Sequence, residues 1–317
     1  MAMPAKTKGW NIYYTILVLW ILVYSTLILN TPVNPQSAAL YNISEQGLFI
    51  IRVTLAIPMF IIWFAGVFAF SALKRYVNLI RDTKEEPAFR DMLKGVGFIV
   101  WLGILSSIIS TTSSYFAQGA SDFSWRPITS TLSQYFFVIP YLIGFSYFLR
   151  SSMRFFNLHG KTLKFTKKFI IAASVFISLL GYIFLTLIFS HEASFQQVGD
   201  IRPTYYIGPA AATLTLIVPT FIAWFLGIAS IQGFSRYVKE ATGIIYKSMF
   251  NWISLGIVFL VFLSIFLEGL RSIGSAAILQ LGLWQILALI YILIFIIAVA
   301  YISLAIGVRK LTKIESV

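Results

Sequence analysis

The chain has 317 residues, of which 59% are hydrophobic and only 11% are charged, and its formal net charge is +13. Soluble proteins carry about 25% charged residues, so this composition excludes an ordinary soluble fold and indicates a protein whose solvent is a lipid bilayer. The sequence contains no cysteine, which excludes disulfides, thiolate catalysis and metal sites with cysteine ligands.

Eight apolar segments follow one another along the chain, and each approaches or exceeds the length of about 20 residues that a membrane-spanning helix needs. They are Trp10–Leu29, Val53–Leu73, Val96–Ala117, Leu132–Leu149, Phe169–Phe189, Tyr206–Phe234, Met249–Leu267 and Ala276–Val308. Strands of a membrane β-barrel would alternate apolar and polar residues, and these segments do not. The sequence therefore predicts an all-α integral membrane protein with eight transmembrane helices.

Basic residues gather in every second connection between these segments and near both ends of the chain. Only Arg52, Arg126, Arg202 and Arg271 fall on the opposite side. The positive-inside rule then predicts a multi-pass protein of the cell membrane with both termini in the cytoplasm. The basic face is expected to attract anionic lipid headgroups rather than nucleic acid, because no exposed module combines basic and aromatic residues.

The chain repeats itself. Thr54–Gly66 reads TLAIPMFIIWFAG and Thr215–Gly227 reads TLIVPTFIAWFLG. Further matches occur in the same order: Arg75-Tyr76-Val77 with Arg236-Tyr237-Val238, Thr26-Leu27-Ile28 with Thr186-Leu187-Ile188, Gly97 with Gly256, and Gln134 with Gln285. Four crossings return a chain to its starting side, so the matches predict two parallel four-helix repeats related by a pseudo-twofold axis along the membrane normal. Residues 1–150 form the first repeat, 151–168 a basic cytoplasmic linker and 169–317 the second repeat.

Two prolines interrupt the repeated helices. Pro58 and Pro219 each remove the backbone hydrogen bond to the carbonyl four residues earlier, which belongs to Thr54 and Thr215 respectively. In lipid a freed carbonyl needs another partner. Either a neighbouring group satisfies each kink, or the two carbonyls and threonine hydroxyls line a polar outer vestibule on the pseudo-twofold axis.

Small and hydroxyl-bearing residues add candidates for a pathway. Gly66 and Gly227 allow helix backbones to approach closely. Trp63 lies near the middle of its segment and is interpreted as core packing. The run SSIISTTSSYF begins at Ser106, and its Ser110 and Thr111 either bond to neighbouring helices or line a wet cavity.

Charge and catalytic groups are scarce at membrane depth. Glu268 precedes Arg271 by three residues, a spacing that predicts an interfacial ion pair, with Arg52 as an alternative partner. His159 and His191 lie on opposite faces and cannot hold one metal ion together. We therefore predict neither a catalytic residue nor a cofactor or metal site, and we do not expect an enzyme.

Two function classes fit this sequence equally well. One is a channel or carrier for a neutral or apolar solute, or an ion, with its path near the pseudo-twofold axis. The other is a non-catalytic subunit, scaffold or anchor within a larger membrane complex, with protein partners or further copies of the chain around it. A hydrated cavity on the axis would distinguish them, because transport requires one.

Overall fold

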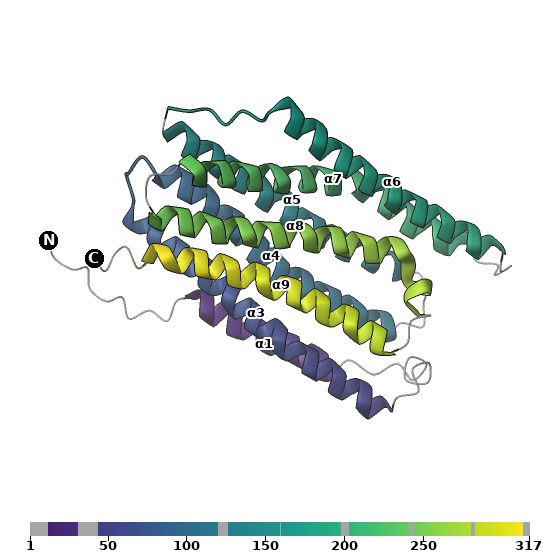
Figure 1. Cartoon of the computed structure of the whole chain (residues 1–317). Helices are drawn as coiled ribbons and strands as arrows, with labels where there is room; N and C mark the ends of the chain where they lie inside the picture. The colour runs from purple at the N-terminus through teal and green to yellow at the C-terminus, as the bar shows by residue number, and fades with distance from the viewer. Residues whose placement is uncertain are drawn as a thin grey trace.

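The computed structural model describes residues 12–30, 44–119, 126–158, 160–197, 203–240, 244–279 and 283–312. Within these ranges every regular element is an α-helix (Figure 1). The eight helices are α1 (Ile12–Asn30), α3 (Glu45–Leu79), α4 (Glu86–Gly119), α5 (Arg126–Leu158), α6 (Lys167–Gln197), α7 (Pro203–Glu240), α8 (Ile244–Leu279) and α9 (Leu283–Thr312).

Most of these helices can cross a bilayer. Six of them, α1, α3, α4, α7, α8 and α9, are long and apolar enough to do so among the described residues. The 35 residues of α3 make a rod of about 52 Å, whereas the hydrocarbon core of a bilayer is only about 30 Å thick. The chain is therefore a multi-pass helical membrane protein, as predicted, and its longer helices extend beyond the lipid tails.

Each of the eight predicted segments overlaps a helix of its own, and six of these helices are long and apolar enough to span a membrane, but the start of the last segment was wrong. We predicted Ala276–Val308 as one segment, whereas Ala276 belongs to α8 and the next helix begins only at Leu283. The residues on both sides of this break are apolar. Composition alone therefore could not place the end of one helix and the start of the next.

The helices form one bundle in which α6 runs along one edge and α1 along the other (Figure 1). Helix α4 packs on α5, and α8 packs on α9. Helix α3 lies against α9, and α5 lies against α7 and touches α8, so the first four helices contact the last four through α3 and α5. At the edges, α1 contacts α3 and α4, while α6 contacts α7 and α8.

An aromatic cluster joins the helices at one end of the bundle. Phe155 of α5 is 2% exposed, and its ring centroid lies 4.9 Å from Phe89 of α4 and 4.9 Å from Phe250 of α8. Tyr237 of α7 completes the group at 5.2 Å from Phe155. Edge-to-face ring pairs add about 0.5–1.5 kcal/mol beyond the area they bury. Phe155 lies within residues 151–168, so the segment predicted as a linker contributes a buried side chain to this cluster.

Two glycines of the repeated stretches, Gly66 and Gly227, allow close helix contacts. A Cβ atom on Gly66 of α3 would overlap the ring of Tyr301 in α9 and lie 3.1 Å from Val100 of α4. A Cβ atom on Gly227 of α7 would overlap Val261 of α8 and lie 3.2 Å from the ring of Phe145 in α5. Each glycine therefore faces one valine and one aromatic ring, and each is required by close approach rather than by an unusual backbone conformation.

A second pair of glycines also makes matching contacts. The Cβ position of Gly95 in α4 is 3.0 Å from the carbonyl oxygen of Gly144, and that of Gly256 in α8 is 3.0 Å from the carbonyl oxygen of Ala300. Gly97 instead faces a ring of α3. The contacts of Gly256 therefore match those of Gly95, although the sequence comparison paired Gly256 with Gly97.

Candidate functional site

A cavity of about 160 Å³ lies between α3, α4, α5, α8 and α9, near the middle of the bundle. Apolar side chains make up most of its wall. The residues that give it polarity or space are Trp63, Gly103, Ser106, Ser107, Tyr141 and Tyr301. An apolar protein cavity of roughly 150 Å³ is large enough to bind benzene. The cavity can therefore hold a small, compact molecule.

The hydroxyl groups of the cavity wall are held by the backbone of α4. Tyr301 donates a hydrogen bond to the carbonyl oxygen of Ile99 over 3.2 Å, and so ties α9 to α4. Ser107 donates to the carbonyl oxygen of Gly103 over 3.1 Å. These bonds satisfy the hydroxyl donors at membrane depth, and they fix the direction of the hydroxyls around the cavity.

No described residue that lines the cavity carries a charge. Moving an ion into such a wall would remove its hydration without supplying an opposite charge, which costs several kcal/mol or more. The cavity is therefore suited to a neutral molecule.

Trp63 has a larger role than the sequence suggested. It is 3% exposed and packs against Tyr24 at 5.1 Å and Phe60 at 5.8 Å between ring centroids, as core packing predicts. It also lines the cavity. Those two ring contacts, from α1 and from its own helix, restrict the orientation of the indole beside the cavity.

The predicted pathway residues of α3 lie away from this cavity. Thr54 is exposed, and its hydroxyl donates to the carbonyl of Ile50 over 2.8 Å within its own helix. Pro58 is half-buried inside α3. Gly66 is buried against Tyr301, a residue of the cavity wall, without lining the cavity itself.

The matching residues of α7 follow the same pattern where the structure describes them. Pro219 is half-buried, and Gly227 is buried in the contact described above. The side chains of Thr215, Ser110, Thr111, Glu268, Arg271 and Arg52 lie outside the described part of the structure. The vestibule, the hydroxyl contacts and the interfacial ion pair assigned to these residues stay predictions.

Three cavity residues went unnoticed in the sequence. Tyr141 and Tyr301 are tyrosines within apolar helices, and this mixture of a ring and a hydroxyl at membrane depth was the available signal. Gly103 offered no signal, because a glycine between apolar residues equally fits close helix packing. The first two serines of the hydroxyl-rich run of α4, Ser106 and Ser107, line the cavity.

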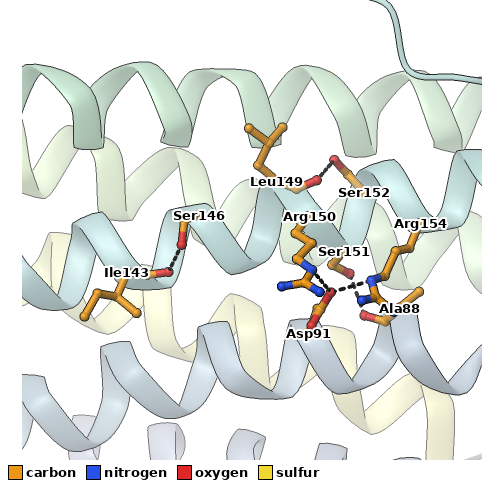
Figure 2. A network of polar contacts seen from close by, with 9 residues as sticks. All are labelled: Ala88, Asp91, Ile143, Ser146, Leu149, Arg150, Ser151, Ser152 and Arg154. Carbon is orange, nitrogen blue, oxygen red and sulfur yellow. Dashed lines mark hydrogen bonds and ion pairs between the residues drawn. The ribbon is translucent and has the colours of Figure 1, made fainter.

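A polar cluster joins α4 to α5 (Figure 2), and it lies next in sequence to Phe89 and Phe155 of the aromatic cluster. The carboxylate of Asp91, which is 4% exposed, lies 2.7 Å from Nε of Arg154 and 3.1 Å from Nε of Arg150. Beside it Ser151 donates to the carbonyl oxygen of Ala88 over 2.8 Å. One buried carboxylate facing two arginines fixes the register of the two helices and leaves a net positive charge there.

Comparison of the sequence with protein-family models, with curated proteins and with solved structures finds no match. The function is therefore inferred from the geometry of this chain alone.

Proposed function

We propose that this protein is a carrier or channel for a small, neutral and mostly apolar solute, which binds in the central cavity. The observation that carries the proposal is an uncharged cavity of about 160 Å³ walled by helices from both the beginning and the end of the chain. In the same proposal the chain consists of two parallel four-helix repeats about a pseudo-twofold axis along the membrane normal, with both termini in the cytoplasm.

Equivalent contacts support the repeat. The offset of 161 residues between Thr54 and Thr215 also separates the two glycines Gly66 and Gly227 and their valine contacts, Val100 and Val261. It separates two ring pairs as well, since Tyr76 lies 4.9 Å from Phe89 and Tyr237 lies 5.0 Å from Phe250. Repeated sequence would not produce matching contacts between helices unless the two units packed alike.

The helix packing supports the same arrangement. Each contact made by α1, α3 and α4 among themselves has a counterpart among α6, α7 and α8, and the packing of α4 on α5 corresponds to that of α8 on α9. The contacts between the two halves also match. Helix α3 packs against α9, and its proposed counterpart α7 packs against α5, the proposed counterpart of α9.

The position of the cavity agrees with a path near the axis. Tyr301 packs against Gly66 as Phe145 packs against Gly227, and the two rings are 156 residues apart in the sequence. The same offset relates Tyr141 to Ile297, and both line the cavity. A twofold axis passes midway between two equivalent residues. A cavity that touches both Tyr141 and Ile297 therefore lies close to the proposed pseudo-twofold axis.

Cysteine accessibility tests the proposal on a chain that has no native cysteine. Three single variants are compared in intact membranes: Ser107→Cys in the cavity wall, Ser254→Cys in packed interior and Ser146→Cys on the exposed outside of α5. N-ethylmaleimide, a small neutral reagent, is expected to modify Ser107→Cys at least about tenfold faster than the two control cysteines. A solute pathway would let the reagent and water reach this thiol, and only a thiol that water reaches forms the reactive thiolate.

Equal, slow modification of all three cysteines would contradict a solute pathway. The protein would then be assigned to the other class, a non-catalytic membrane subunit whose interior is closed. Intact folding of each variant is checked by its elution from a size-exclusion column.

A further inference from the structure

The two equivalent tryptophans have different surroundings. Trp224 of α7 is fully buried, and its indole Nε1 donates a hydrogen bond to Oγ of Ser264 in α8 over 3.0 Å. A buried indole N–H needs such a partner, because burial removes its hydrogen bond to water and leaves the donor unsatisfied. Trp63 is its counterpart in the repeated stretch of α3.

The serine that satisfies Trp224 is absent beside Trp63. The residue 161 positions before Ser264, and so its counterpart in the first repeat, is Gly103. A glycine has no side chain to accept a hydrogen bond. Trp63 and Gly103 both line the central cavity. The side-chain acceptor in one half is thus replaced in the other by a glycine that borders the space of the cavity.

That space is open to a ligand atom. Among the described residues, a Cβ atom on Gly103 would have one neighbour within 4 Å, the hydroxyl oxygen of Tyr301 at 3.0 Å, which would have to move by a few tenths of an ångström. The glycine therefore leaves room at the point where a serine hydroxyl would otherwise enter the cavity.

We propose that Nε1 of Trp63 donates a hydrogen bond to an oxygen atom of the bound solute, in the place that Ser264 occupies beside Trp224. This inference rests on the proposed function and narrows its substrate class. The solute is a compact, uncharged and mostly apolar molecule with a hydrogen-bond acceptor oxygen, such as a ketone or an ether. Trp63 gives the binding site its preference for that oxygen, and Gly103 gives the site its volume.

Two ring compounds of similar size test this assignment. 4-Fluoroacetophenone has a carbonyl acceptor and 4-fluorotoluene has none. The full chain is labelled with ¹⁵N in the tryptophan indoles and placed in lipid nanodiscs, and the Trp63→Phe variant identifies the Trp63 resonance. We expect the ketone to move the Trp63 indole proton downfield and to bind about threefold to tenfold more tightly than 4-fluorotoluene, as one neutral hydrogen bond allows.

Matched variants at the two equivalent positions supply the controls. Gly103→Ser introduces the missing hydroxyl and is expected to shift the Trp63 indole proton without ligand and to abolish the response to the ketone. Ser264→Gly removes the hydroxyl beside Trp224 and is expected to leave the ketone response of Trp63 unchanged.

Protection of Ser107→Cys from N-ethylmaleimide reports occupancy of the cavity independently of the indole. A ketone that protects this cysteine without moving the Trp63 proton would overturn the role of Trp63 while leaving the cavity as a binding site. If neither compound protects the cysteine and N-ethylmaleimide does not reach it faster than the controls, the proposed function fails and this inference fails with it.

Discussion

Two buried hydrogen-bond donors of the bundle, the indole of Trp224 and the hydroxyl of Tyr301, are satisfied by groups on neighbouring helices. Trp224 reaches Ser264 on the adjacent helix, and Tyr301 reaches the carbonyl of Ile99 on α4. Within a membrane protein such bonds also connect helices that have no hydrophobic driving force for association in lipid. Loss of the acceptor should therefore cost more than loss of an equally buried hydroxyl without a partner.

Ser264→Ala tests this expectation at the residue scale. It leaves the indole of Trp224 without its acceptor and should lower the free energy of unfolding by about 1–3 kcal/mol. Ser254→Ala is the matched control, because Oγ of Ser254 is buried and has no hydrogen-bond partner in the described structure. Denaturant unfolding in detergent measures both, and an equal loss in the two variants would contradict the importance of the indole bond.

At the scale of helices, close packing depends on a few glycines at crossings. Gly66 brings α3 onto α9 and Gly227 brings α7 onto α8 and α5, and in each case a methyl group would overlap a neighbouring side chain. In soluble helices an alanine would be the better residue by about 1 kcal/mol, so these positions trade helix propensity for close approach.

Alanine at each of these glycines should therefore destabilise the bundle. Gly66→Ala and Gly227→Ala are each expected to cost about 1–3 kcal/mol of the free energy of unfolding, because an extra carbon must be forced into a filled contact. Gly103→Ala provides the comparison, since its new methyl group would enter the cavity and meet only the hydroxyl of Tyr301. A greater loss for Gly103→Ala than for the other two would contradict the assignment of close contacts and free space.

For the whole molecule, the distribution of basic residues predicts which end of the bundle faces the cytoplasm. Ser44, at the start of α3, and Lys84, in the connection after α3, are both exposed and lie beyond opposite ends of that helix. The positive-inside rule assigns the end that carries Lys84 to the cytoplasm.

Single cysteines at these two positions test the orientation. A membrane-impermeant thiol reagent added to intact cells should label Ser44→Cys at once and Lys84→Cys only after the membrane is permeabilised. The cysteine-free parent chain gives the background. The opposite order of labelling would reverse the predicted topology and place both termini outside.

The sequence by itself determined the solvent, the helices and the proposal of a repeat. Long apolar segments have few stable conformations in lipid other than helices, so the membrane-spanning fold followed from composition and length. Residues such as Pro58 and Pro219 could be matched because a repeat preserves spacing along the chain.

Only the tertiary structure decided which helices meet and what lies between them. Contacts such as Gly66 with Tyr301 join residues far apart in sequence, and spacing along one helix does not reveal which neighbour it faces. Gly103 and Ser264 are separated by the same 161 residues as Thr54 and Thr215, yet a cavity beside one and a hydrogen bond beside the other depend on side chains from several helices. The cavity could not be predicted from sequence because empty space is a property of the packed bundle, not of any single segment.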